Sequence, residues 1–544
     1  MRRRSAPGVV SRRRLLVAGS TLAAGAAISR ALPGTARARK ASTAGLARRG
    51  PRFRTPLRIP EALTGADLRI PIEQAQVQVL PGRRTKMWTF GGSFPGPTIR
   101  RPSGERTRVR FDHLLGEEAG ELTVHLHGGH NRASEDGRPG GLTAAQPTSA
   151  YCDISPRLSP VESGNDVLIA PGGSRTYTFD AVEDGGPERA AFHWYHDHRL
   201  DKSARNVWNG LAGMWILDDA FDASLPLPAG PHDIPLMIAD RAFDARNQLT
   251  DPFSQNRKPP FDGVTGRQIL VNGAVRPQHK VKARRYRLRL LNASNFRAYN
   301  LHLTGGVKMI QIATEAGLMP APLERDRILL GPGERVELIV DFAGARGERV
   351  QLRSDRREGH DEPGSTTFRG ALMEFRVARR RSDDPTSVPQ ALRPLPDWVA
   401  EAPALPSHRW KITVSAGLQP TWLINGRSYD PAYADVQVRL GETVTWQIEN
   451  RTSVAHLMHL HHTDWYLLAR DGNPPPPWER CLKETFFLDP GERIVVAGHF
   501  SDHTGPYVVH CHMLDHEDHG LMSQFEVVDP LLPGGPIRTK KNAR

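Results

Sequence analysis

Short runs of alternating or β-branched residues, most of them preceded by a tight turn, recur along the chain. Successive side chains of a strand point to opposite faces of a sheet, so runs of this kind predict half-buried strands. Patterns long enough for amphipathic helices are few. Strands separated by Gly, Pro and Asp turns favour an all-β fold of Greek-key sandwiches or barrels.

One sequence motif, a Pro-Gly turn that leads into a strand-like run, occurs three times at nearly equal spacing. The chain of 544 residues is too long for one ordinary core and long enough for three domains of about 150 residues each. We therefore expect three copies of one β-fold, over residues 55–222, 223–385 and 406–530, with residues 386–405 as a linker. The three copies of this motif are Ala170-Pro171-Gly172-Gly173, Gly331-Pro332-Gly333-Glu334 and Asp489-Pro490-Gly491-Glu492.

The formal net charge of +14 is concentrated at the ends of the chain. Residues 1–50 hold twelve Lys and Arg and no Asp or Glu, and the tail, residues 531–544, is basic as well. This distribution does not predict a nucleic-acid partner, because a binding face needs its cations on a folded surface.

The N-terminus has the three parts of an export signal. A basic start is followed by an apolar stretch at residues 15–28 and by small residues at Ala36-Arg37-Ala38. Residues 11–16 read Ser-Arg-Arg-Arg-Leu-Leu, which is similar to the twin-arginine (Tat) signal of proteins that are exported already folded. We expect residues 1–38 to be this signal, residues 39–54 to be a basic leader, and the mature protein to be periplasmic or extracellular without a membrane anchor.

The chain has three cysteines, too few for a fold built on disulfides. Cys511 stands between two histidines. Cys152 and Cys481 lie in polar, Pro-rich surroundings, and in an oxidising compartment they either form a disulfide or stay free. Both alternatives remain open, because distance in space decides the pairing.

Ten of the 22 histidines gather in four clusters. On a strand, residues i and i+2 point to one face, so each His-x-His pair directs two imidazoles into the same space. The residue between them points the other way, which puts Cys511 on the face opposite His510 and His512. The clusters are His125-Leu126-His127, His196-Asp197-His198, His456-x-x-His459-x-His461 and His510-Cys511-His512-x-x-x-His516.

A soft thiolate and two imidazoles, from Cys511, His456 and His516, are the trigonal ligand set of a blue-copper electron-transfer site. Imidazole alone suits copper, zinc, iron and nickel alike, so the other eight histidines do not choose a metal by themselves. The thiolate beside paired imidazoles selects copper.

These residues and their order closely resemble the multicopper oxidases, the family of laccases, bilirubin oxidase and bacterial spore-coat laccase, over residues 55–530. The resemblance implies three consecutive cupredoxin-like domains and four copper ions, one of type 1, one of type 2 and a type 3 pair. It assigns His456, Cys511 and His516 to the type 1 ion. It assigns the remaining histidines to the trinuclear cluster, namely His125 and His459 to the type 2 ion and His127, His196, His198, His461, His510 and His512 to the type 3 pair.

Comparison of the repeats predicts one blue site per chain. Laid on the third repeat, the first repeat has Leu122, Asp197 and Lys202 at the three positions of the type 1 ligands. The matching run of the middle repeat, residues 297–303, keeps only His302. The middle repeat is therefore expected to hold no metal and to act as a spacer.

Reduction of dioxygen also needs protons in an apolar site, which requires a placed carboxylate. Glu517 directly follows His516, and Asp136 lies nine residues past His127. Both match acids near the cluster in the spore-coat laccase group. We predict that Glu517 delivers protons and that Asp136 makes a water channel polar or, in the simpler interpretation, begins a turn before Gly137.

One position departs from the spore-coat group, whose axial methionine falls ten residues after the cysteine. That position is Leu521 here, and Met522 follows it. A missing axial thioether should raise the reduction potential of the type 1 ion, as in high-potential laccases. A one-residue slip that lets Met522 bind is the alternative.

The leading hypothesis is a laccase-like oxidase that takes single electrons from phenols, aromatic amines or a bilirubin-type pigment near an exposed edge of His516 and reduces dioxygen to water. The alternative is a metallo-oxidase of cuprous or manganous ions in metal homeostasis. Cuprous oxidases carry a Met-rich segment, whereas the ten Met here are not clustered. A blue-copper electron carrier or copper store is the third class, and it does not need the other eight histidines. Dioxygen and a small aromatic or metal-ion reductant are the expected partners.

Overall fold

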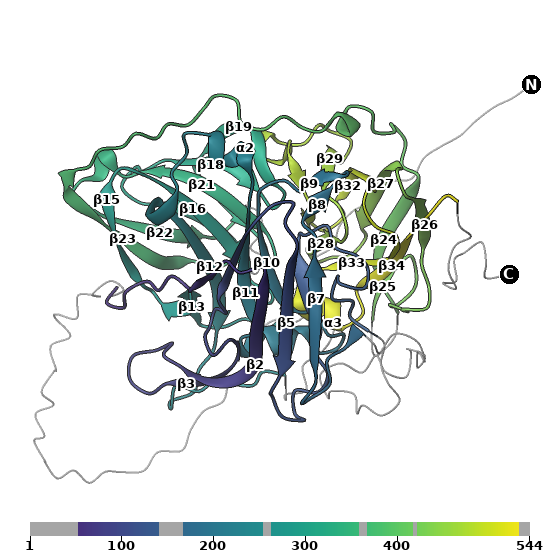
Figure 1. Cartoon of the computed structure of the whole chain (residues 1–544), viewed down its shortest axis with the longest axis horizontal. Helices are drawn as coiled ribbons and strands as arrows, with labels where there is room; N and C mark the ends of the chain where they lie inside the picture. The colour runs from purple at the N-terminus through teal and green to yellow at the C-terminus, as the bar shows by residue number, and fades with distance from the viewer. Residues whose placement is uncertain (1–52, 141–166, 254–262, 358–366, 417–420, 532–544) are drawn as a thin grey trace, which may run out of the picture. The chain divides into compact units, whose positions relative to one another are not determined.

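The computed structural model describes residues 53–140, 167–253, 263–357, 367–416 and 421–531 (Figure 1). The predicted export signal, nearly all of the basic leader and tail, and Cys152 lie outside these ranges, so the pairing of Cys152 with Cys481 stays open. Strands dominate the regular structure, which confirms the all-β prediction. In the part of the chain that is described, no helix is long and apolar enough to cross a membrane.

The first segment, residues 55–222, forms two sheets that enclose a core around Phe111, Tyr177 and Trp215. One sheet has the order β3 (Thr85–Phe90), β2 (Asp67–Val77), β5 (Thr107–His113), β7 (Ser174–Phe179). The other has the order β1 (Ala62–Leu63), β4 (Thr98–Pro102), β11 (Ala212–Asp218), β10 (Ala191–Asp197), β6 (Val124–His127). A small separate ribbon pairs β8 (Val182–Glu183) with β9 (Gly186–Pro187).

The middle segment, residues 223–385, repeats the two-sheet arrangement around Leu288, Leu338 and Phe375. Its larger sheet has the order β14 (Ala274–Val275), β13 (Gln268–Val271), β12 (Asp233–Arg241), β16 (Arg285–Asn292), β21 (Arg335–Asp341), β18 (Met309–Thr314), β19 (Gly317–Arg325). Its smaller sheet has the order β15 (Gln278–Ala283), β23 (Gly370–Arg381), β22 (Arg349–Asp355), β17 (Tyr299–Leu303), β20 (Ile328–Leu330).

The third segment, residues 406–530, packs its two sheets around Trp446, Trp465 and Phe525. One sheet has the order β25 (Trp422–Ile424), β24 (His408–Val414), β27 (Thr443–Asn450), β32 (Arg493–His499), β29 (Trp465–Arg470), β30 (Leu482–Lys483). The other has the order β26 (Val436–Arg439), β34 (Met522–Val528), β33 (Gly505–Cys511), β28 (His456–Leu460), β31 (Thr485–Leu488). Each of these six sheets thus takes all its strands from one predicted segment, and the segment boundaries themselves stay a prediction.

Helices are few and short, and two of them join the outer segments. The backbone N–H groups of Ser203 and Ala204 in α1 donate to the carboxylate of Asp518 in α3 at 3.1 and 2.9 Å. This contact lies next to two predicted site residues, His516 and Glu517. Within the described ranges, the α-helices are α1 (Ser203–Asn209), α2 (Ala220–Ser224) and α3 (Leu514–Asp518), and the 3-10 helices are η3 (Gly230–His232), η4 (Ala343–Ala345), η5 (Asp397–Val399) and η6 (Pro477–Glu479).

The predicted linker, residues 386–405, is bound along the molecule by its backbone. Ser387 N donates to Pro226 O at 2.8 Å, and Leu392 N donates to Pro320 O at 2.9 Å. The side chain of Leu392 is buried. This stretch is therefore docked on the middle segment, although its Pro-rich composition alone is typical of a free linker.

Candidate metal centres

The histidine pairs lie on strands that face one another within each outer segment. In the first segment, His125 on β6 pairs with His196 on β10. In the third segment, His459 on β28 pairs with His510 on β33, and the next pair is Met458 with Cys511. Antiparallel pairing brings ligands from strands far apart in the sequence to one face, as strand alternation predicts.

The three predicted type 1 ligands, His456, Cys511 and His516, lie close together, and we call them the sulfur-containing trio. The Nδ1 atoms of His456 and His516 lie 3.2 Å apart, and each lies 3.7 Å from Cys511 Sγ. Separations of this size fit three ligands of one metal ion, because metal bonds to nitrogen and sulfur are about 2.0 to 2.3 Å long. Thr452 Oγ1 lies 3.0 Å from His456 Nε2, which leaves Nδ1 to the metal.

Burial raises the pKa of the Cys511 thiol to about 12. The side chain belongs to the hydrophobic core of the third segment, on the face opposite the histidines beside it in the sequence. A thiol in such surroundings stays protonated unless a cation stabilises its thiolate. The geometry and the environment therefore both fit a bound metal ion.

The other eight histidines form one cluster between the first and third segments. The Nε2 atom of His510 lies 3.2 Å from His198 Nε2 and 3.1 Å from His461 Nε2, so these three imidazoles aim at one point. All eight side chains are buried. Further sets with ligand atoms within 4.8 Å of one another are His125 with His127 and His196, and His125 with His459 and His461.

Several of these imidazoles hydrogen-bond through one ring nitrogen and leave the other without a partner. His125 Nδ1 donates to Asp136 O at 2.6 Å, His196 Nδ1 to Asp197 O at 2.9 Å, and His459 Nδ1 to Glu484 O at 3.1 Å. Their buried Nε2 atoms have no hydrogen-bond partner among the described residues. Metal-bound histidines show this pattern, because the outer N–H bond fixes the ring while the other nitrogen binds the ion.

Burial and neighbouring imidazoles lower the pKa of His459 and His461 well below its usual value. The same causes act on His125 and His127. Imidazoles with lowered pKa values are neutral at physiological pH, which is the form that binds metals.

Asp136 is 1% exposed and contacts two of the clustered histidines. His461 Nδ1 donates to its Oδ2 at 2.7 Å, and its backbone oxygen accepts from His125. The next residue, Gly137, has a φ of +67°, and a Cβ there would lie 2.3 Å from Val124 O. Asp136 therefore begins a turn and also orients two imidazoles, whereas its predicted effect on a water channel stays a prediction.

Glu517 lies in α3 between imidazoles of the two outer segments. Its Oε2 is 3.2 Å from His510 Nδ1, and its Oε1 is 3.6 Å from His198 Nδ1. Burial raises the pKa of Glu517, but His198 and His510 lower it more, so the pKa falls below its usual value. The structure thus places this acid against the cluster.

Glu484 contacts the cluster from β31's N-terminal side and was not predicted from the sequence. His127 Nε2 donates to its Oε1 at 2.9 Å, and Thr485 Oγ1 donates to the same oxygen at 3.1 Å. The signal that could have revealed it is a lone acid within the apolar, strand-like run 481–488. A buried carboxylate in such a run needs a charged partner.

That partner, Arg335, comes from the middle segment. Its Nη2 donates to Glu484 Oε2 at 3.2 Å, its Nη1 donates to Glu484 Oε1, and its Nε donates to Phe192 O of the first segment at 2.8 Å. Two residues earlier, a Cβ on Gly333 would lie 2.8 Å from Cγ of His512. The middle segment is therefore more than the expected spacer, because its Pro-Gly turn contacts the cluster.

The predicted exposed edge of His516 is wrong. The side chain is 1% exposed. Its ring packs against Phe296, with centroids 5.1 Å apart, and against Trp422, with centroids 4.7 Å apart. The sequence places all three residues in different regions, so their packing could not be anticipated.

The structure separates Leu521 from Met522. Leu521 belongs to the same hydrophobic core as Cys511, and its backbone oxygen accepts from Cys511 N at 3.0 Å. Met522 packs on the other side of the strand with Val508 and Leu514. The branched hydrocarbon, and not the thioether, therefore lies on the side of the sulfur-containing trio.

Comparison with known proteins gives the family. Models of the multicopper oxidase family match residues 71–153 and 403–530. The chain is 30% identical to a laccase of Bacillus subtilis (strain 168), over 82% of this chain and 91% of the relative. A laccase of Haloferax volcanii is 32% identical, over 96% of this chain and 91% of that protein. The chain belongs to the multicopper oxidase family, and is thus a copper-dependent oxidoreductase that uses dioxygen.

Two further comparisons concern the fold and a relative with a different name, bilirubin oxidase. The solved McoA multicopper oxidase of Aquifex aeolicus has a TM-score of 0.72 and 26% identity, and the match covers 88% of this chain and all of that structure. This similarity confirms the predicted series of cupredoxin-like domains. A bilirubin oxidase of Albifimbria verrucaria is 30% identical, over 80% of this chain and 72% of that protein.

Glu484→Ala tests the carboxylate that joins the segments. Removing it leaves Arg335 buried without its counter-charge, which costs roughly 3–5 kcal/mol, and frees His127. We expect a lower melting temperature and fewer copper ions per chain, measured by calorimetry and metal analysis. Glu449→Ala, which breaks a surface pair with Arg451, is the control and should change neither. Full copper content in the Glu484 variant would contradict the role.

Leu521→Met tests the axial position. A thioether on the side of Cys511 should lower the reduction potential of a copper ion bound by the sulfur-containing trio, because an axial ligand tunes it. Redox titration of the blue absorption measures the change. Met522→Leu is the matched control, since it lies on the other side of the strand and should leave the potential unchanged. The reverse result would show that Met522 is the axial residue.

Proposed function

We propose that this protein is an exported, laccase-like multicopper oxidase that takes single electrons from phenols, aromatic amines or bilirubin-type pigments. Four such electrons reduce one dioxygen molecule to two water molecules. The laccase and bilirubin oxidase relatives support the substrate class. The basic and apolar N-terminus, with its twin-arginine-like run, supports export by the Tat route to the periplasm or the exterior.

One observation carries the proposal. Cys511 belongs to the sulfur-containing trio, and the residues bonded to it in the chain, His510 and His512, belong to the histidine cluster. Two peptide bonds thus give a covalent path from the trio to the cluster. A separate electron carrier would need the trio but no such cluster.

Four copper ions are proposed to occupy these sites. Bound copper supplies one-electron redox chemistry at the trio and dioxygen chemistry at the cluster. His456, Cys511 and His516 would hold the type 1 ion, and His125 and His459 the type 2 ion. The type 3 pair would be held by His127, His196, His198, His461, His510 and His512.

The two acids have different proposed tasks. Glu517, which lies against His198 and His510, is placed to deliver protons to dioxygen at the cluster. Asp136 holds His461 and His125 through its side chain and its backbone. Its proposed contribution to the polarity of a water channel follows from its carboxylate beside the type 2 side of the cluster.

Oxygen uptake by the copper-loaded protein tests the substrate class. With 2,6-dimethoxyphenol or bilirubin as reductant we expect uptake of dioxygen, with one molecule consumed for every four electrons withdrawn. Cuprous ion is the comparison. Faster uptake with cuprous ion than with either organic reductant would make the protein a metallo-oxidase, and no uptake with any of them would make it an electron carrier.

Cys511→Ser tests the connection between the sites. A hydroxyl does not replace the thiolate, so the intense blue absorption and the activity should be lost while the histidine cluster keeps its copper. Absorption and electron paramagnetic resonance spectra measure both. Cys481→Ser is the control, because Cys481 is also buried but lies outside the sulfur-containing trio and donates to Trp478 O at 3.5 Å, so its replacement should leave both properties intact. A blue, active Cys511 variant would overturn the assignment.

A further inference from the structure

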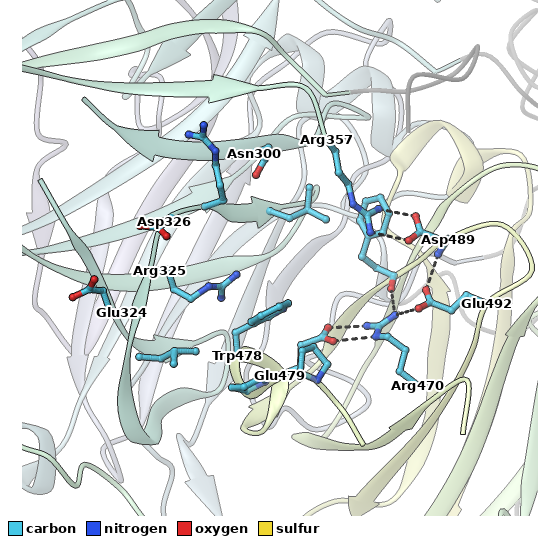
Figure 2. Close-up of a pocket in the computed structure, with 16 residues that line it drawn as sticks. Asn300, Glu324, Arg325, Asp326, Arg357, Arg470, Trp478, Glu479, Asp489 and Glu492 are labelled. Carbon is cyan, nitrogen blue, oxygen red and sulfur yellow. Dashed lines mark hydrogen bonds and ion pairs between the residues drawn. The ribbon is translucent and has the colours of Figure 1, made fainter. Parts of the chain in front are cut away.

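A cavity of about 530 Å³ lies between the middle and third segments (Figure 2). One wall comes from the end of β19 and the start of β20, and the other from η6 and β31. Cavities of this size hold molecules of one or two rings. None of the predicted metal ligands lines it.

Two of the arginines in this cavity are neutralised by carboxylates. Arg357 donates two hydrogen bonds to Asp489, at 2.7 and 2.8 Å. Arg470 pairs with Glu479 at 2.7 Å and with Glu492 at 2.8 Å. Figure 2 shows these pairs together on one side of the cavity. They leave no free positive charge there for a ligand.

Arg325, on the opposite wall, has a different environment. Among the described residues it has no carboxylate within ion-pair distance, and its side-chain hydrogen bond goes to Gln311 Oε1 at 2.7 Å. The neighbouring acids, Glu324 and Asp326, pair with Lys308 instead. Burial lowers the pKa of Arg325 more than the nearby Glu479 carboxylate raises it, to about 10, so Arg325 remains a cation at neutral pH. A half-buried cation of this kind favours an anionic ligand.

Aromatic and aliphatic side chains complete the cavity. The guanidinium of Arg325 lies 4.2 Å from the ring centroid of Trp478, which is 42% exposed. Phe487 is partly exposed and lines the same space, together with Leu323 and Leu329. These surfaces suit a flat apolar ring rather than a fully hydrated anion such as phosphate.

We propose that this cavity binds a small aromatic carboxylate. The carboxylate accepts hydrogen bonds from the free N–H groups of Arg325, and the ring packs against Trp478 and Phe487. The charged group fixes the orientation, and the aromatic contacts supply the apolar surface that binding buries.

The cavity lies close to the sulfur-containing trio, which indicates a function for the bound ligand. Phe487 pairs with Leu457 across β31 and β28, and the adjacent pair is Leu488 with His456. Leu457 N donates to Cys511 Sγ at 3.5 Å. A molecule in the cavity therefore lies one strand away from the sulfur-containing trio, by a path that does not require an exposed His516.

A phenolic carboxylate bound there would serve as a reductant, a step that rests on the proposed function. Each molecule loses one electron and its hydroxyl proton and becomes a phenoxyl radical. Four molecules supply four electrons and four protons, which convert one dioxygen into two waters. Dioxygen, the oxidant, is the co-substrate of the family.

Calorimetric titration of the copper-loaded protein with 4-hydroxycinnamate and with its methyl ester tests binding without any turnover, under anaerobic conditions. A charged hydrogen bond contributes about 1.5–3 kcal/mol, so the acid should bind roughly tenfold or more tightly than the ester. Arg325→Gln should remove this difference. Arg327→Gln is the matched control, because Arg327 lines the same wall but pairs with Asp355 at 2.8 Å, and it should keep the difference. Equal binding of acid and ester by the wild type would overturn the proposal.

Steady-state kinetics test the task of the bound molecule. In the Arg325 variant the KM for 4-hydroxycinnamate should rise roughly tenfold, whereas kcat and the KM for the ester should stay the same. An unchanged KM for the acid would overturn the role of the cavity as a reductant site. If the wild type oxidises 2,6-dimethoxyphenol or bilirubin but not the acid, only the role of the cavity as a reductant site is overturned. If it oxidises none of them, the proposed function fails, and the titration still decides whether the cavity binds the acid.

Discussion

The arrangement of the metal centres depends on one buried carboxylate, Glu484. It accepts from an imidazole of the first segment, His127, and from a guanidinium of the middle segment, Arg335, while its own backbone oxygen holds His459. A buried charge is costly unless every lone pair finds a donor, so the three segments must meet in one relative position to satisfy it. The same contacts of Glu484 therefore fix both the relative position of the domains and the orientation of the histidine ligands.

The same logic extends to the rest of the cluster. Each outer segment supplies only half of the eight clustered imidazoles, so the cluster needs both. Helices α1 and α3 join these segments through Asp518, beside His516 and Glu517. The docked linker then ties the third segment to the middle one along its surface. Restraints at the cluster, at the helices and along the linker together explain how ligands from distant parts of the chain can share one site.

The sequence was sufficient for the all-β fold and, through strand alternation, for the common direction of the two imidazoles in each His-x-His pair. That pairs from the first and third segments share one cluster was implied by the resemblance to the multicopper oxidases and not by periodicity. It placed Asp136 and Glu517 near the cluster but did not show what they contact. Glu484 and Arg335 were missed, since a partner across segments leaves no periodic signal in either one. The burial of His516 was also missed, because Phe296 comes from the middle segment and Trp422, although in the same segment as His516, is far from it in the sequence. The docking of the linker was missed as well, because the backbone hydrogen bonds that hold it do not depend on side-chain type.

The two faces of the strand that starts at Met522 have a consequence for how this protein could diverge. Leu521 packs in the same core as the Cys511 thiol and Met522 in a different one, so the side chain offered to a metal proposed to bind at Cys511 depends on the length of the turn after α3 as well as on residue type. Deleting a single residue from the turn would exchange a hydrocarbon for a thioether without any substitution. The reduction potential of a copper ion bound at Cys511 would then respond to the number of residues in that turn, without any change of residue type.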